Sequence, residues 1–414
     1  MPDGPLRGVR VLDFTHVWAG PLCSRTLGDL GAEVIKVEAA WARGTATPPA
    51  ASPFTSGASN PNDDHWNRQG VTNKLNRNKL GICVDSKRDE GRDVLMQLVR
   101  ECDVVVENFS ARAMKSMGLD WSVLSAINPA IIYVAMPGFG HSGPYKDYVA
   151  YGTVVEPMCG LTSFMGYGPD EPRVTATAEP DPSAGMAAAT AIVTALSRRD
   201  RDGKGRYVEL SLQEAAIALF GEYFLLEQMG ETPQPSGNTH PDYSPCGVYP
   251  ASGQDDWLAI SVRDDDEWRR LAAVLGPAAQ DDGRFSDRDG RARHHDVIDE
   301  HISAWTRVRD KASAMAELQA VGVAAGAVNR TSDLLADPQN CARDYFVELH
   351  APHMNSMQYA GLPVRINGKR AEGWHAAPRL GEHNREVLTG LLGMDDAEVD
   401  ALYDAGVLTE HPPG

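Results

Sequence analysis

The apolar positions of the first 140 residues fall into short runs that alternate with amphipathic stretches. The runs predict β-strands over residues 9–14, 32–38, 82–84, 103–107 and 131–135, and the helical spacing of apolar side chains predicts helices over residues 20–30, 90–101 and 121–127. Strand, helix and strand within residues 9–38 indicate a βαβ unit with parallel pairing. Its repetition predicts a doubly wound α/β domain. The loop at residues 15–20 then lies at the carboxyl end of a strand, where such sheets bind ligands.

The pattern changes beyond residue 200. Residues 204–212 alternate and predict a strand, and residues 213–229 form a long apolar stretch that predicts one helix. Residues 233–237 hold two prolines and a glycine, which is typical of a domain boundary. Residues 240–325 mix short strands, acidic runs and helices, and indicate a second, smaller domain. Residues 380–403 predict two further helices.

Asp181 marks the change from a loop to a helix rich in small residues. Pro182 suits the first helical position, because its missing N–H would be unsatisfied there, so Asp181 is the expected N-cap. Capping is the commoner role for such a residue. The alternative is a nucleophile: an aspartate is ionised at neutral pH and needs no general base to attack a carbonyl carbon. The local pattern leaves both roles open.

Two further stretches could bind anions. Residues 65–84 contain four basic side chains and no acid, at Arg68, Lys74, Arg77 and Lys79. They form a candidate anion-binding strip, although a solvated loop is the commoner explanation. Residues 138–143 match G-x-G-x-x-G, but Pro144 and a charged segment follow them rather than an apolar helix. A dinucleotide-binding role is therefore rejected.

Composition narrows the function classes. A chain of 414 residues predicts two domains. Its formal charge of −18 argues against binding nucleic acid or an anionic membrane. No signal peptide, membrane-length apolar run or metal motif is recognisable. The six cysteines are scattered, at Cys23, Cys83, Cys102, Cys159, Cys246 and Cys341, which indicates reduced thiols in a cytoplasmic protein.

Seven motifs, taken together, resemble those of the class III CoA-transferases, the group that includes the formyl-CoA, carnitine and bile-acid enzymes. They are Val11-Leu-Asp-Phe-Thr-His-Val-Trp-Ala-Gly-Pro21, Leu27-Gly-Asp-Leu-Gly-Ala-Glu-Val-Ile-Lys-Val-Glu38, Asn76-Arg-Asn-Lys79, Val106-Glu-Asn-Phe109, Gly138-Phe-Gly-His-Ser-Gly-Pro144, Asp181 with Ser183-Ala-Gly-Met186, and Leu380-Gly-Glu-His383. Each motif alone is weak. Their occurrence in this order over nearly the whole chain is a strong signal.

The resemblance implies an α/β fold with a Rossmann-like large domain, built from both ends of the chain, and a smaller middle α+β domain. Residues 1–225 would form the amino-terminal part of the large domain with the CoA and catalytic sites. Residues 226–330 would form the small domain with its linkers, and residues 331–414 would return to the large domain. Two chains are expected to thread through each other as an interlocked homodimer.

The resemblance also implies the chemistry. Asp181 would attack the thioester of a donor acyl-CoA to give a mixed anhydride and free CoA thiolate. The thiolate would then form an aspartyl-CoA thioester and release the donor acid, and an acceptor carboxylic acid would reverse these steps. Acyl-CoA and a carboxylic acid are the expected partners, and no tightly bound cofactor is expected.

The family's CoA-binding positions fall mainly on the loops that follow the predicted strands. They are His16, Trp18, Ala19, Arg77, Lys79, Val84, Asp85, Lys87, Asn108, Phe109, Ser110, Arg112, Lys115 and Tyr151. Some positions depart from the family. Ala39, Ser110 and Ser116 stand where arginines are common, and Arg112 and Lys115 are candidates to substitute for them. Trp18 replaces a glutamine of formyl-CoA transferase, which argues against an oxalate or formate enzyme and leaves room for a larger acyl group.

Three alternatives compete. A 2-methylacyl-CoA racemase of the same superfamily needs a His/Asp acid–base pair, and Tyr151 and Gly152 stand at those positions. His16 and His141 remain as possible bases. A non-catalytic CoA-binding protein of the same fold is a second alternative, and the retained Asp181 counts against it. A Rossmann oxidoreductase is the third, and the rejected glycine motif weakens it.

Overall fold

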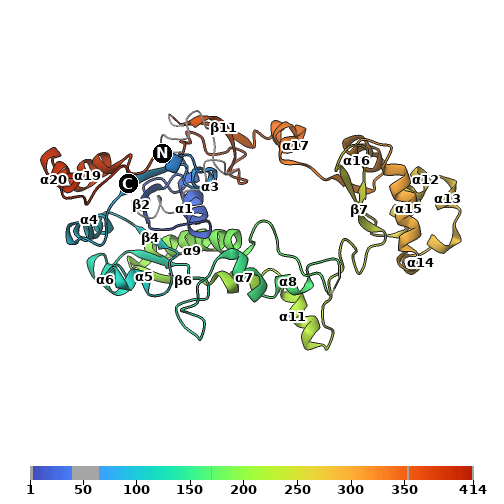
Figure 1. Ribbon diagram of the computed structural model, residues 1–414, viewed down its shortest axis with the longest axis horizontal. Helices are drawn as coiled ribbons and strands as arrows, with labels where there is room; N and C mark the ends of the chain where they lie inside the picture. The colour runs from blue at the N-terminus through green and yellow to red at the C-terminus, as the bar shows by residue number, and fades with distance from the viewer. Residues whose placement is uncertain (1–2, 40–64, 169, 352–353, 413–414) are drawn as a thin grey trace. The chain divides into compact units, whose positions relative to one another are not determined.

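The computed structural model describes residues 3–39, 65–168, 170–351 and 354–412 (Figure 1). The chain divides into two compact units. The first comprises residues 1–161, 174–229 and 344–414, and the second comprises residues 162–173 and 230–343. The domain boundaries expected from the sequence lie at residues 225/226 and 330/331. They stay predictions.

A parallel six-stranded sheet forms the centre of the first unit, in the order β3-β2-β1-β4-β5-β6. The strands are β1 (Arg10–Asp13), β2 (Glu33–Glu38), β3 (Lys79–Cys83), β4 (Val104–Glu107), β5 (Ile132–Ala135) and β6 (Arg206–Glu209). The chain first builds outward from β1 to β3 and then continues on the other side of β1. This is the strand order of doubly wound dinucleotide-binding sheets, so the predicted α/β fold class is confirmed.

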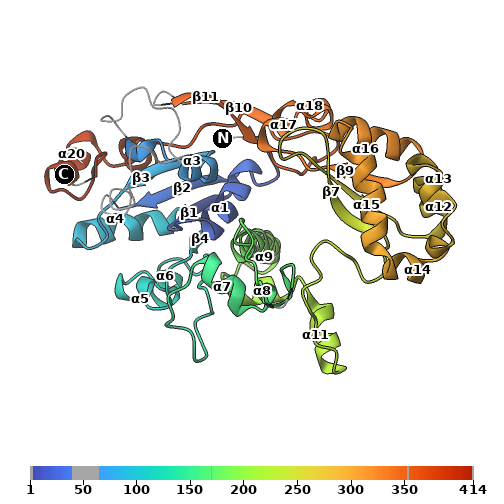
Figure 2. The same cartoon turned by 45° about the vertical axis from the view of Figure 1, so that its right-hand side comes forward.

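Helices cover both faces of this sheet, because its central strands are apolar on both sides. In β1, for example, Val11 faces one buried cluster and Leu12 faces the other. One face carries α4 (Asp89–Arg100), α5 (Ala113–Ser116), α6 (Trp121–Ile127), α19 (Asn384–Leu392) and α20 (Asp396–Asp404). The other carries α1 (Ala19–Asp29), α7 (Gly152–Met158), α9 (Pro180–Asp202) and α10 (Leu212–Ile217). Figure 2 shows α9 nearly end-on beside α1.

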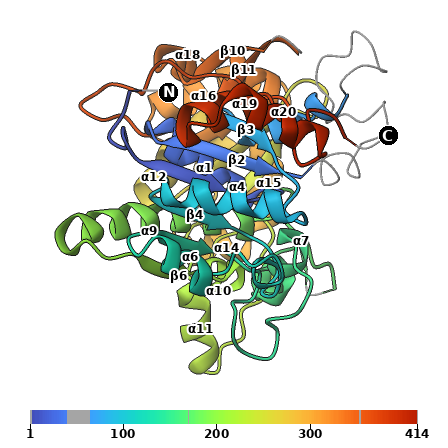
Figure 3. The ribbon, with the colours of Figure 1, turned by 90° about the vertical axis from the view of Figure 1, so that its left-hand side faces the viewer.

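The carboxyl-terminal segment completes the first unit. The N–H of Gly81 donates to His383 Nδ1 at 3.1 Å, and the N–H of Cys83 donates to Asn384 Oδ1 at 2.7 Å. These bonds satisfy outward-facing groups of β3, which is an edge strand. Figure 3 shows α19 and α20 beside β3 and α4. The first unit also contains α3 (Gly70–Leu75), α11 (Gly221–Gln228) and the hairpin of β10 (Phe346–Ala351) and β11 (Met354–Ala360).

The second unit has its own antiparallel sheet and its own core. Its sheet has the order β7-β8-β9, and Trp268, Phe285 and Trp305 are among the buried side chains that pack on it. Its strands are β7 (Cys246–Pro250), β8 (Trp257–Ser261) and β9 (Ala324–Ala327), and its helices are α12 (Asp265–Leu275), α13 (Pro277–Gln280), α14 (Arg288–Arg293), α15 (His295–Thr306), α16 (Lys311–Ala320), α17 (Thr331–Ala336) and α18 (Pro338–Ala342). Helix α8 (Leu161–Phe164) begins at the last residue of the first segment of the first unit. This agrees with the expected smaller α+β part of the chain.

The single helix predicted over residues 213–229 is wrong. The chain forms α10 and α11 instead, and Phe220 between them has a non-helical backbone (φ −138°, ψ 47°). The ring of Phe220 is only 5% exposed, and Gly221, a weak helix former, follows it. Burial of the ring therefore outweighs continuation of the helix. Among the described residues, no helix combines the length and the apolar character needed to cross a membrane.

Candidate active site

The carboxyl ends of β1, β2, β3 and β4 open on one cavity of about 750 Å³. Its wall includes His16 after β1, Ala39 after β2, Val84 after β3 and Phe109 after β4. The strand order reverses between β1 and β4. Ligands of open α/β sheets bind in the crevice at such a reversal, so this cavity is the candidate substrate site.

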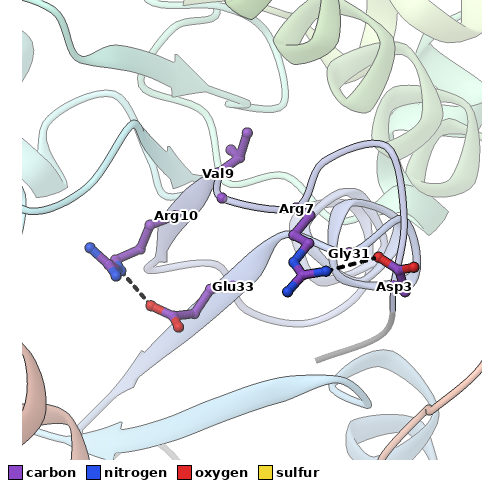
Figure 4. A pocket seen from close by; sticks show the side chains of 7 residues that line it. Asp3, Arg7, Val9, Arg10, Gly31 and Glu33 are labelled. Atoms are coloured by element: carbon purple, nitrogen blue, oxygen red, sulfur yellow. Dashed lines mark hydrogen bonds and ion pairs between the residues drawn. The ribbon is translucent and has the colours of Figure 1, made fainter.

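A second pocket of about 420 Å³ lies at the opposite, amino-terminal ends of β1 and β2 (Figure 4). Its charged side chains neutralise one another in pairs. Arg10 pairs with Glu33, and the exposed Arg7 pairs with Asp3 at 3.6 Å. It lies away from the carboxyl ends of the strands, so it has no part in the candidate active site.

A buried ionic network supports the loop that follows β1. Asp13 is fully buried at the end of this strand and accepts hydrogen bonds from the N–H of Thr15 at 2.8 Å, Ser24 Oγ at 2.7 Å and Lys79 Nζ at 2.9 Å. Lys36 lies 4.0 Å from Asp13 and donates to the carbonyl of Thr15. Although burial opposes it, the two lysines hold the pKa of Asp13 far below its usual range. Together they fix the start of the loop.

The rest of the loop is held in a strained conformation. Val17 lines the cavity with φ at 68°, in the left-handed region that a β-branched residue rarely adopts. Asn108 holds the loop from β4: its Oδ1 accepts from the N–H of His16 and its Nδ2 donates to the carbonyl of His16, both at 2.7 Å. A Cβ on Gly20 would lie 2.4 Å from the Thr15 side chain. Such over-determined strain is typical of functional sites.

Asp181 lies in the first turn of α9, which begins at Pro180. The expected capping role is wrong, because Glu179 occupies the N-cap position and the Asp181 carboxylate lies beside other segments. The backbone N–H groups of Ala19 and Gly152 lie close enough to this carboxylate to lower its pKa. A Cβ on Gly152 would lie 1.9 Å from Asp181 Oδ2, so only glycine allows this approach. The carboxylate is therefore presented to the loop after β1 and to the start of α7.

The environment of Asp181 makes it a more basic carboxylate than a free aspartate. The residue is 8% exposed. Burial raises its pKa to about 6, and the two N–H donors oppose this rise. At neutral pH most molecules therefore carry an ionised, poorly solvated carboxylate. Because Ala19 is the first residue of α1 and closely follows the loop residues 15–17 that line the cavity, the start of α1 connects Asp181 with the cavity.

The predicted CoA-binding residues fall into three groups. His16, Val84, Lys87 and Phe109 line the cavity. Trp18, Ala19 and Asn108 do not line it but belong to, directly follow or hold the loop between the cavity and Asp181. Asp85, Ser110, Lys115 and Tyr151 lie outside the cavity lining, with Tyr151 58% exposed. Arg112 is exposed and pairs with Asp147 at 2.5 Å.

Arg77 and Lys79 are not brought to the cavity wall. Arg77 is 1% exposed, pairs with Asp29 at 2.6 Å and stacks its guanidinium 4.2 Å above the Trp374 ring. Lys79 is held by Asp13, and burial lowers its pKa to about 8 despite that partner. Among the described residues, both cations therefore pair with buried aspartates inside the first unit and do not line the cavity.

Sequence reasoning missed Lys36 and Gly152. Lys36 lines the cavity from β2, where it stands between the buried Ile35 and Val37, and a charged residue between two apolar ones was the available signal. Gly152 gave none, because its importance lies in contacts with a residue 29 positions away in the chain. Among the described residues, no cluster of three histidine, cysteine or acidic side chains could hold a metal ion.

Comparison with known proteins identifies the family. Residues 6–384 match CoA-transferase family III. Succinyl-CoA–D-citramalate CoA-transferase of Chloroflexus aurantiacus is 31% identical over 98% of this chain and 99% of its own length. Succinate–glutarate CoA-transferase of Agrobacterium fabrum is 33% identical over 94% of this chain and 96% of its own length. The crystal structure of a CAIB/BAIF family protein from Brucella suis, 29% identical, covers 94% of this chain and all of its own with a TM-score of 0.83. The chain therefore belongs to CoA-transferase family III and is a CoA-transferase.

Proposed function

We propose that this enzyme moves CoA from an acyl-CoA to a carboxylic acid through a covalent aspartyl-CoA thioester on Asp181. The observation that carries the proposal is a buried carboxylate beside two backbone N–H groups, one of them at the start of α1, directly after the loop that lines the cavity. A carboxylate with a pKa of about 6 is still ionised at neutral pH, and it is a stronger base than a free aspartate.

The reaction begins with attack of an Asp181 oxygen on the donor's thioester carbonyl. The C–S bond breaks, which gives a mixed anhydride and CoA thiolate. The thiolate attacks the Asp181 carbonyl carbon and releases the donor carboxylate. The acceptor carboxylate then attacks this aspartyl thioester, and the freed thiolate takes the acyl group of the second anhydride. The enzyme carboxylate is thereby restored. Retention of the thiolate beside the anhydride makes its return effectively intramolecular.

The N–H groups of Ala19 and Gly152 would also stabilise the transition states and tetrahedral intermediates of the reaction. Negative charge develops on the Asp181 carbonyl oxygen whenever the thiolate or the acceptor attacks that carbon. Two fixed backbone donors at this oxygen would stabilise it as an oxyanion hole, in a site with little competing water. We infer that the same two N–H groups position the nucleophile and then stabilise each tetrahedral intermediate.

The cavity would hold the CoA moiety. The rings of His16 and Phe109 lie on one wall with their centres 5.3 Å apart and their planes tilted by 46°, and Lys87 supplies a cation on another part of the wall. The named relatives act on succinyl-CoA with citramalate and on succinate with glutarate. Succinyl-CoA is therefore the first donor to test. All six cysteines are free thiols, which supports a cytoplasmic location.

We also infer a homodimer. Helix α11 buries none of its residues in the chain itself, and Leu219, Phe224, Leu225 and Met229 in and around it are 41–72% exposed. Apolar surface of this kind normally packs against a partner, and the family resemblance implies an interlocked second copy.

The covalent route is tested by intact-mass spectrometry after mixing the enzyme with a panel of acyl-CoA thioesters. The wild type should gain the mass of a CoA residue, which neutral hydroxylamine removes. Asp181→Ala should gain nothing. Asp200→Ala, which removes an exposed carboxylate from the same helix, should behave like the wild type. Turnover without an adduct, or an adduct on Asp181→Ala, contradicts the route. α-Proton exchange into heavy water without transfer would instead identify a racemase.

A further inference from the structure

Lys74 lies near two other cations, Arg25 and Arg77, which share one buried carboxylate at the end of α1. Asp29 is fully buried and pairs with Arg77 at 2.6 Å and with Arg25 at 3.7 Å. A guanidinium nitrogen of Arg25 donates to the carbonyl of Lys74 at 3.5 Å. Among the described residues, Lys74 has no carboxylate within 4.0 Å. The cluster therefore carries two more positive charges than negative ones.

The side chain of Lys74 is exposed, and its ammonium group lies over an aromatic ring. The residue lies in the last turn of α3, and its Nζ is 4.9 Å from the centre of the Trp18 ring. This contact fixes the ammonium group over an aromatic face. Burial lowers the pKa of Lys74, and the charges of Arg25 and Arg77 lower it further. An anion beside this lysine would be favourable, because it would offset the cost of burial and the repulsion by Arg25 and Arg77.

Lys74 lies near residues that line the cavity and near the residue whose N–H lies beside Asp181. Val71, three residues earlier on the same helix face, lines the cavity. Trp18 follows Val17, which also lines the cavity, and precedes Ala19, whose N–H lies beside Asp181. The ammonium group of Lys74 and the indole of Trp18 thus lie next to residues 17–19, which run from the cavity wall to the N–H beside Asp181.

We propose that Lys74, seated on Trp18, forms a subsite for a second carboxylate on the acyl group, so that the enzyme selects acyl groups of dicarboxylic acids. The indole face would cover the methylene chain, and the ammonium would pair with the distal carboxylate. This inference rests on the proposed reaction at Asp181, since the subsite acts on the acyl group that Asp181 attacks.

The test compares succinyl-CoA with butyryl-CoA, which has a methyl group in place of the distal carboxylate. For Lys74→Met, the ratio of kcat/KM for succinyl-CoA to that for butyryl-CoA should fall about 30-fold or more, as expected for loss of a charge-assisted contact. Lys74→Arg should retain most of the ratio. Lys87→Met is the matched control: this lysine lines the cavity, so its loss should lower both values alike and leave the ratio unchanged.

Three outcomes overturn the subsite. The ratio could stay constant in Lys74→Met, both substrates could lose activity equally because Lys74 holds a CoA phosphate, or the wild type could fail to prefer succinyl-CoA. The mass adduct separates this inference from the proposed reaction. If butyryl-CoA labels Asp181 and succinyl-CoA does not, only the subsite is wrong. If no acyl-CoA labels Asp181, the reaction itself is wrong.

Discussion

Asp181 shows why the role of a single residue could not be read from its neighbours. A proline before or after an aspartate at the start of a helix fits a capping role, and Pro180 and Pro182 flank Asp181 here. The helix begins two residues earlier than expected, so the carboxylate turns to donors at positions 19 and 152. Those donors come from other elements. The family motif indicated the nucleophile, whereas the local pattern favoured the cap.

Burial of this carboxylate should reduce the stability of the enzyme at neutral pH. Its folded-state pKa of about 6 lies above the unfolded value of about 3.9. Burial of the ionised form therefore costs stability, and this cost is absent below the unfolded pKa and complete above pH ~6. Asp181→Asn removes it. Between pH 5 and pH 7.5 the free energy of unfolding of the wild type should fall by about 1 kcal/mol relative to that variant.

Urea denaturation of both proteins at the two pH values measures this difference. Asp200→Asn, at an exposed position of the same helix, should show no such change with pH. In the wild type the same titration should reduce turnover as the pH falls through about 6, because protonation removes the nucleophile. A stability difference that does not depend on pH would mean that Asp181 titrates at its ordinary value.

At the scale of elements, much of the sheet could be predicted from the chain and little of its ionic interior. The strands that form β1 to β5 and the helices that become α1, α4 and α6 lie close to their expected ranges, because apolar spacing is a local property. The basic strip was harder. Arg77 bonds to a residue 48 positions away and Lys79 to one 66 positions away. Pairing over such distances leaves no trace in the local sequence, so the strip resembled an anion site.

Helix α7 is attached at two points to the segment that leads to Asp181. At its first residue, Gly152 contacts the Asp181 carboxylate. One turn later, Glu156 is fully buried and accepts hydrogen bonds from the N–H of Thr175 at 2.5 Å and from its Oγ1 at 2.6 Å. Glu156 thus holds residues 175–181 against the helix whose N–H lies beside the nucleophile. We infer that it is a positioning residue for Asp181.

Glu156→Gln should impair the chemical step more than substrate binding. Its amide keeps one acceptor oxygen for the N–H of Thr175 but places an NH₂ at the hydroxyl, so the charge-assisted bond that the hydroxyl donates to the carboxylate is lost. We expect kcat to fall about 10-fold, since small displacements of a reacting group are costly. The KM for acyl-CoA should change less than twofold, because neither Glu156 nor Thr175 lines the cavity.

Steady-state kinetics of Glu156→Gln and Thr175→Val test the clamp, with Ala176→Ser as a control on an exposed residue of the same segment. Both clamp variants should lower kcat and shift the acidic limb of its pH profile, and the control should do neither. A merely structural role would appear as a lower Tm with an unchanged pH profile.

At the scale of the whole molecule, the sequence indicated two domains but not where the chain exposes its apolar surface. Residues 213–229 were expected to form one long apolar helix. Instead α11 carries Phe224 and Leu225 on its surface, and it follows a break at Phe220. None of its residues is fully buried, so α11 gains little from tertiary packing beyond contacts such as that of Phe224 with the Phe220 ring, and a helix of eight residues is too short to be stable by itself. We therefore infer that contacts outside the chain add to its stability.

A second copy of the chain is the simplest source of these contacts, and an interlocked arrangement makes a kinetic prediction. Light scattering should give twice the chain mass of 44.8 kDa. Phe224→Glu with Leu225→Glu should give monomers or fail to fold, whereas Val308→Glu, which changes an exposed residue of the second unit, should leave the dimer intact.

When dimers with two different tags are mixed, threaded chains cannot exchange without unfolding. Mixed dimers should therefore form only after denaturation and joint refolding. Rapid exchange in native buffer would show that the chains pack side by side, and a monomeric wild type would leave the exposed face of α11 without its proposed partner.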